Sequence, residues 1–180
     1  CQHFPMPLIT FFSAPKPFTN PHIAMIQRNA IKSWTLLPDV EVILLGEETG
    51  LAEAARELGV KHVQNVKRNE NGTPLISSMF QLAREYGHGE LLCIINADMI
   101  LMSDFVEAAK QVKSLKSQFV LLSQRWDLDV TQHLEFIDGW QSRLSFIVRR
   151  QGTLHRPAGS DFFLFPKSCY TDIPDFIIGR

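Results

Sequence analysis

Residues 93–104, CIINADMILMSD, decide the fold. They open inside the apolar run of a buried β-strand expected at 91–95, cross the polar triplet Asn96-Ala97-Asp98 and return to apolar residues. A buried strand fixes the backbone that directly follows it, so we expect Asp98 to be held rigidly and partly shielded from water. Asn96 lies two residues earlier and therefore points to the same side of an extended chain. The stretch predicts an amide and a carboxylate presented together at the end of an inner strand.

Short apolar runs alternate with amphipathic segments on both sides of this stretch. The alternation favours an α/β fold, with a mainly parallel sheet that carries helices on both faces. In an open sheet of this kind, ligands bind beyond the carboxyl ends of the strands. We expect strands at 8–12, 40–45, 61–66, 91–95, 119–123 and 161–165, and helices at 21–34, 49–58, 75–86, 104–114 and within 130–150.

Length and charge narrow the classes of protein further. The 180 residues carry a formal net charge of −1, and this length favours one domain. No surplus of basic residues predicts a nucleic-acid partner, and no apolar stretch is long enough to span a membrane. No signal peptide is visible, which favours a cytoplasmic location. We expect a single domain over 1–180, with a first part at about 7–123 and a second segment at about 124–180 that is truncated at its C-terminus.

The residues that directly follow the expected strands form a polar rim. Its acid, base, amide and hydroxyl groups suit a charged ligand with several parts. A hard divalent cation prefers carboxylate oxygen and bridges well to diphosphate, so Asp98 is a candidate metal ligand. The rim comprises Ser13, Ala14, Pro15, Lys16, Gly46, Glu47, Arg68, Asn69, Gly72, Asn96, Asp98, Gln124, Arg125 and Trp126.

The triplet at 96–98 resembles the Asp-x-Asp motif of glycosyltransferases with the A-type fold, in the nucleotide-diphospho-sugar transferase superfamily, with Asn in first place. The run IINADMIL at 94–101 resembles the strand that carries this motif. The segment RNENGTPLISSMFQLA at 68–83 resembles the loop and helix that line the sugar-nucleotide pocket. The resemblance covers most of residues 8–123, and GSDFFLF at 159–165 looks like a later acceptor-side strand.

The resemblance implies a glycosyltransferase that moves a sugar from a UDP- or GDP-type donor to an unknown acceptor, with Mn²⁺ or Mg²⁺ bound at Asp98. Gly72 belongs to the loop expected beside the donor. Of the two candidate general bases, Asp161 is the first, placed at the acceptor or donor sugar, and Asp127 is the second. The remaining contacts implied are Thr10, Ser13, Ala14 and Pro15 with the nucleoside, Glu47 with base or ribose, Arg68 with phosphate, and Asn96 and Asp98 with ribose, sugar and diphosphate.

Other interpretations stay open. Asp98 and Asn96 are also common turn residues, and Arg68 also suits a solvated loop. The same fold could serve as a non-catalytic nucleotide-sugar-binding or interaction domain. A sugar-phosphate nucleotidyltransferase is less favoured, because it needs a glycine-rich loop after the first strand, and SAPKPFTNP at 13–21 has no glycine. No GxGxxG follows any strand, which argues against a dehydrogenase.

Overall fold

A computed structural model describes residues 6–177 of the chain, so residues 1–5 and 178–180 of the expected domain lie outside the described part. None of the helices in that part is long and apolar enough to cross a membrane. The elements are β1 (Ile9–Ser13), α1 (Pro21–Thr35), β2 (Val40–Leu45), α2 (Leu51–Leu58), β3 (Lys61–Val63), α3 (Ile76–Tyr86), β4 (Leu91–Ile95), α4 (Ser103–Leu115), β5 (Trp126–Asp127), α5 (Trp140–Gln151), β6 (Thr153–Leu154) and β7 (Phe162–Pro166).

The central sheet has the order β3-β2-β1-β4-β7. The first four strands run parallel, and β7 joins the edge antiparallel to β4, with Ile95 opposite Phe162. This arrangement confirms the mainly parallel sheet expected from the sequence. The chain adds strands outward from β1 on one side and then returns to place β4 on the other. The sheet therefore changes its winding direction between β1 and β4, where open α/β sheets have a crevice.

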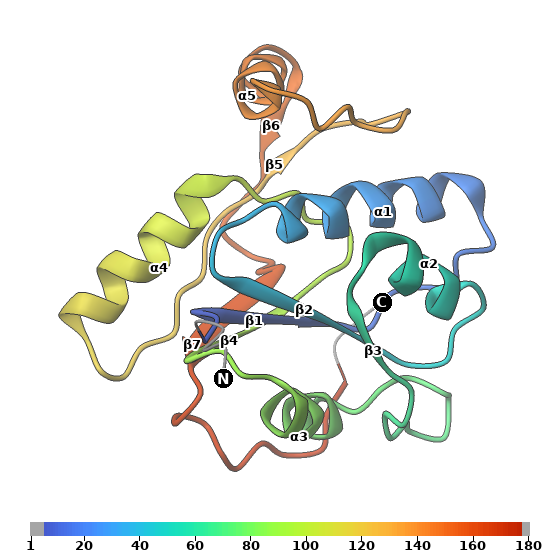
Figure 1. Ribbon diagram of the computed structural model, residues 1–180, viewed down its shortest axis with the longest axis vertical. Helices are drawn as coiled ribbons and strands as arrows, with labels where there is room; N and C mark the ends of the chain where they lie inside the picture. The colour runs from blue at the N-terminus through green and yellow to red at the C-terminus, as the bar shows by residue number, and fades with distance from the viewer. Residues whose placement is uncertain (1–5, 178–180) are drawn as a thin grey trace, which may run out of the picture.

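Helices cover both faces of the sheet, as the alternating pattern predicted (Figure 1). One core joins Phe11 of β1 to Trp34 of α1 and to residues of α2 and α4. The other core joins Phe12, the next residue of β1, to Phe80 of α3. Consecutive strand residues point to opposite faces of the sheet, and helices cover both faces. Every residue of β1 and β4 is therefore buried, and the apolar runs of these strands are nearly continuous.

Two helix ends follow the local signals in the sequence. Asn20 caps α1 by accepting hydrogen bonds from the amides of His22 and Ile23 at 2.9 and 3.1 Å, and Pro21 opens the first turn. Gly59 ends α2 in the left-handed region, with φ 68°, where a side chain would be strained.

One predicted strand is wrong. Residues 119–123 form no strand, because only Leu121 bridges Leu164 of β7, and β7 itself takes the place beside β4. The helix expected within 130–150 is present as α5, and it begins at Trp140. The buried Asn29 side chain of α1 binds the Gln132 carbonyl and the Leu134 amide, at 3.1 and 2.9 Å, and holds that segment in an irregular path. Tertiary contacts therefore override local propensity in the second half of the chain.

Glu41 and Thr10 fasten β2 to β1 far from the switch point. The Thr10 hydroxyl donates to Glu41 Oε1 at 2.5 Å, and Glu41 also accepts from the His88 amide. Burial raises the pKa of Glu41, but the hydrogen bonds from Thr10 and His88 outweigh it and leave the pKa below its usual 4.5. A carboxyl group whose pKa is lower in the folded than in the unfolded protein stabilises the fold at pH values above the unfolded pKa. This stabilisation is lost as the pH falls through the folded pKa.

We therefore expect the free energy of unfolding to fall as the pH drops below about 4.5 and through the lowered pKa of Glu41. The Glu41→Gln variant should be less stable near neutral pH and should lack this part of the acid dependence. Urea denaturation at a series of pH values between 3 and 7 measures the difference. Parallel pH profiles for the two proteins would contradict this role for Glu41.

Candidate functional site

A cleft opens at the carboxyl ends of β1 and β4, where the sheet changes its winding direction. Its volume is about 380 Å³. The loop after β1 forms one wall, the segment that follows β4 forms another, and the start of α3 lies opposite. Five residues expected from the sequence to bind the nucleotide sugar meet in this cleft: Ser13, Ala14, Pro15, Asn96 and Asp98.

Helix α1 fixes the turn that carries Asp98. The indole nitrogen of Trp34 donates to the Met99 carbonyl at 2.7 Å, and the Ser33 hydroxyl accepts from the Leu101 amide at 3.0 Å. Both α1 side chains are completely buried, which makes these bonds costly to lose. Asp98 is thus exposed on a backbone that is anchored from behind.

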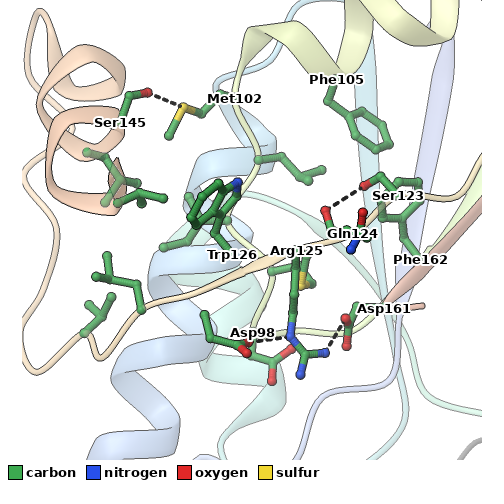
Figure 2. Close-up of a pocket in the computed structure, with 18 of the residues that line it drawn as sticks. Asp98, Met102, Phe105, Ser123, Gln124, Arg125, Trp126, Ser145, Asp161 and Phe162 are labelled. Carbon is green, nitrogen blue, oxygen red and sulfur yellow. Dashed lines mark hydrogen bonds and ion pairs between the residues drawn. The ribbon is translucent and has the colours of Figure 1, made fainter. Parts of the chain in front are cut away.

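Asp98 also lines a second and larger cleft of about 1120 Å³. This cleft lies between the start of α4, residues 123–130 and the inner side of α5 (Figure 2). Among the described residues, none donates a hydrogen bond to the Asp98 carboxylate or forms an ion pair with it. A carboxylate without an internal partner, at the junction of two clefts, can bind a cation or a hydroxyl from a ligand in either one.

Strand β7 brings Asp161 next to Asn96, although 65 positions separate them in the chain. The Asn96 amide nitrogen donates to the Asp161 carboxylate at 3.0 Å, and the Asn96 backbone amide donates to the Asp161 carbonyl at 2.9 Å. Arg125 pairs with the other carboxylate oxygen of Asp161, and Figure 2 shows this ion pair beside Asp98. The Asp161 side chain is only 13% exposed. Asp161 therefore links the end of β4 to the wall of the larger cleft.

The second candidate base, Asp127, belongs to the same cluster. It accepts from Arg125 Nε at 2.7 Å and contacts His155 Nδ1 at 2.8 Å. Hydrogen bonds from Arg125 and His155 hold the pKa of Asp127 below its usual 3.8. Hydrogen bonds to Asp127 and Asp161 raise the pKa of Arg125.

Each of the four carboxylate oxygens in this cluster already has a partner: Asn96 and Arg125 on Asp161, and Arg125 and His155 on Asp127. These contacts tie both acids to Arg125.

Lys16 is the cation that the structure brings to the smaller cleft. The buried side chain of Gln27 holds the Lys16 backbone from both sides, accepting from its amide at 2.7 Å and donating to its carbonyl at 3.0 Å. The side chain itself is exposed. The loop is thus fixed while the ammonium group stays available to an anion in the cleft.

The structure does not bring four of the expected ligand residues to either cleft. Thr10 is fully buried, and its hydroxyl is bonded to Glu41. Glu47 is exposed, and it is the adjacent Glu48 that forms the ion pair with Arg68. Arg68 reaches both oxygens of Glu48 at 3.0 Å and the carbonyl of Gly72 at 2.8 Å. Gly72 adopts φ 75° in the same turn. The expected phosphate contact of Arg68 is thus replaced by a bidentate pair that shapes its loop.

The donor set for a metal is small. In the described part of the chain, no three His, Cys, Asp or Glu side chains gather closely enough to hold an ion. Asp98 supplies one carboxylate, and Asn96 supplies an amide oxygen two residues away. This set fits a hard divalent cation only if a bound diphosphate and water supply the remaining oxygen ligands.

Two residues of the clefts, Gln27 and Asn29, and one residue of the charged cluster, His155, were missed as site residues. The first two lie on α1 with apolar neighbours, so the sequence pattern assigned their segment to a helix without distinguishing them. His155 has no ligand spacing around it in the sequence. The tripeptide Arg125-Trp126-Asp127 and Asp161 before the late strand were the local signals for the cluster.

No protein-family model matches the sequence, and no curated protein matches it closely. Solved structures do resemble it. A mycobacterial protein matches with a TM-score of 0.55 and 14% identity, covering 96% of this chain and 57% of the other. Glucosyl-3-phosphoglycerate synthase from Mycobacterium tuberculosis, solved with UDP, matches with a TM-score of 0.50 and 13% identity, covering 90% and 57%.

A nucleotide-diphospho-sugar transferase described as putative, from Desulfovibrio desulfuricans, matches with a TM-score of 0.47 and 14% identity, covering 90% of this chain and 64% of the other. The chain therefore spans less than two thirds of the length of these three proteins. At such identities the likeness concerns the fold alone. The chain has a mainly parallel α/β fold, and this fold resembles those of the mycobacterial protein and of the glucosyl-3-phosphoglycerate synthase.

Proposed function

We propose that this chain binds a nucleotide-diphosphate sugar and forms the donor half of a glycosyltransferase site. The observation that carries the proposal is the position of Asp98, exposed and without an internal partner among the described residues, between a cleft at the switch point and a larger cleft beside it. A donor in the smaller cleft and an acceptor in the larger one would meet at this carboxylate.

The smaller cleft offers groups for each part of the donor. Ser13 and the loop to Lys16 would contact the nucleoside, and the Lys16 ammonium would lie near the diphosphate. Asn96 would donate to or accept from a ribose or sugar hydroxyl. Helix α3 begins at this cleft with Ile76, and the positive end of a helix favours an anion. Together these groups support a UDP- or GDP-type ligand.

The proposed reaction is a displacement at the sugar. The acceptor oxygen bonds to the anomeric carbon as the bond from that carbon to the diphosphate breaks, and the nucleoside diphosphate leaves with the electron pair. The acceptor proton passes to water or to a carboxylate. Mn²⁺ or Mg²⁺ held by Asp98 would neutralise charge on the leaving group. We propose that Asp161 and Asp127 position Arg125 at the acceptor side of Asp98.

The alternative function is nucleotide-sugar binding without transfer. The absence of a second carboxylate in the 96–98 triplet and the two fully engaged acids, Asp161 and Asp127, favour this alternative. An assay for release of free sugar from the nucleotide sugar, or for its transfer to an acceptor, distinguishes an enzyme from a binding domain.

Nucleotide titration tests the donor site. With MnCl₂ present, UDP or GDP at about one hundred times its Kd should raise Tm by about 5–10 °C. Lys16→Ala should weaken UDP binding by about tenfold and leave uridine binding unchanged, since only the diphosphate would meet the ammonium group. Arg68→Ala is the matched control, because it removes a cation that faces Glu48 and should not distinguish UDP from uridine. No stabilisation by any nucleotide would refute the donor site.

A further inference from the structure

We infer that the larger cleft takes an amphiphilic acceptor, in which the reactive hydroxyl is attached to a hydrocarbon portion. The proposed function supplies the role of the hydroxyl, and this part of the inference rests on it. The hydrocarbon portion is inferred from the side chains that line the cleft. The cleft volume of about 1120 Å³ exceeds what a single sugar needs and lies at the upper end for small-molecule sites.

Three charged groups of the cleft gather at one end, and larger apolar side chains lie away from them at the apolar end. Asp98, Arg125 and Asp161 lie together at the polar end, and Figure 2 shows Met102 on the other side of Trp126 from them and Phe105 beyond Ser123 and Gln124. A ligand that spans the cleft must therefore match charged groups with one part and hydrocarbon with the other.

Side chains from distant segments build the apolar end. Phe105 of α4 packs edge-on against Phe162 of β7, with ring centroids 5.0 Å apart. Leu144 and Val148 of α5 face them from the far wall. The Ser145 hydroxyl lies 3.4 Å from the sulfur of Met102, within hydrogen-bonding reach, and Arg149 and Gln151 also line the cleft from α5. A hydrocarbon that covers the apolar side chains of this end removes them from water, which is favourable.

Trp126 offers such a ligand an exposed aromatic surface inside the cleft. Its side chain lines the cleft and is 51% exposed, although tryptophan is highly buried on average. Its neighbours Arg125 and Asp127 are tied into the charged cluster, so the backbone at Trp126 is held in place. An exposed aromatic ring between a polar and an apolar region is suited to the junction of an amphiphile, where head and hydrocarbon meet.

Calorimetric titration of the whole chain tests this inference with three probes: methyl β-glucoside, octyl β-glucoside below its micelle concentration, and maltotriose. Burying one methylene gains about fourfold in affinity, so two buried methylenes suffice for a tenfold preference. We expect octyl β-glucoside to bind at least tenfold more tightly than either other probe. Equal binding of the two glucosides, or tighter binding of maltotriose, would overturn the inference, the latter in favour of an oligosaccharide acceptor.

Two variants localise the effect. Trp126→Ala should reduce octyl β-glucoside affinity by about tenfold and leave the UDP-dependent rise in Tm unchanged. Phe146→Ala is the matched control, because Phe146 is 61% exposed on α5 and does not line the cleft. Loss of alkyl binding in the control but not in Trp126→Ala would place the hydrocarbon outside the cleft and contradict the inference. If octyl β-glucoside binds as expected but no nucleotide binds, the proposed nucleotide-sugar site in the smaller cleft is wrong. The preference of the larger cleft for an amphiphile is then still supported.

Discussion

Asp98→Ala should abolish the manganese-dependent part of UDP binding and leave the stability of the protein within about 0.5 kcal/mol of the wild type. The carboxylate is exposed and has no partner among the described residues, so its removal breaks no internal contact. A divalent cation in the smaller cleft would lose the carboxylate that Asp98 supplies there, and no other described residue lining this cleft carries one. Titration of UDP with MnCl₂ or with EDTA, followed by calorimetry, separates the metal-linked affinity from the rest.

Asp129→Ala is the matched control for this variant. Asp129 also lines the larger cleft and is exposed, and its substitution removes the same charge away from the smaller cleft. We expect Asp129→Ala to bind UDP as the wild type does, with or without manganese. If Asp98→Ala retains its full manganese-linked affinity, Asp98 is not a metal ligand and the proposed donor site loses its main support.

Arg125→Ala should be the most damaging single substitution in the charged cluster. It leaves the mostly buried Asp161 carboxylate without its counter-ion, which costs about 2 kcal/mol and lowers Tm by about 4–8 °C. It also frees residues 123–129 beside Asp98. Displacement of a wall by about 1 Å is enough to slow a positioned reaction about a hundredfold. Thermal unfolding and a glycosyl-transfer or sugar-nucleotide hydrolysis assay measure the two effects.

Arg125→Lys distinguishes the geometry of the guanidinium from its charge. Arg125 contacts Asp127 through Nε and Asp161 through a terminal nitrogen, and a lysine ammonium cannot reach both carboxylates in this way. We expect Arg125→Lys to recover part of the stability but little of the activity. A lysine variant as active as the wild type would mean that positive charge alone is needed and that the two acids do not position Arg125.

Sequence reasoning located the ends of elements correctly where local signals were strong, but it extended the strand expected at 61–66 three residues beyond β3. Asn20 and Gly59 mark helix ends by their own conformational preferences, and the apolar run before Asn96 is long enough to mark a buried strand. Reasoning from the sequence failed at 119–123, where an apolar run suggested a strand. Its place beside β4 is occupied by β7, which only a comparison of competing long-range pairings could reveal.

Charged residues show the same limit. The sequence identified Arg68 as a rim cation, but it could not show that Glu48 would neutralise it while Lys16 stays available in the cleft. Glu47 and Glu48 are identical in type and adjacent, so only the direction of each side chain decides which one pairs with Arg68.

By itself, the sequence determined the α/β class, the buried strand β4 and the place of Asp98 directly after it, because periodicity and strand burial are local properties of the chain. The exposure of Asp98, which the sequence predicted to be partly shielded, came only from the structure. Only the tertiary structure decided that Asp98 lies between two clefts, that Asp161 meets Asn96 across 65 positions, and that Arg125 ties two acids together. These contacts depend on an antiparallel edge strand and on α1 holding distant loops, and such pairings are set by the packing of the whole domain.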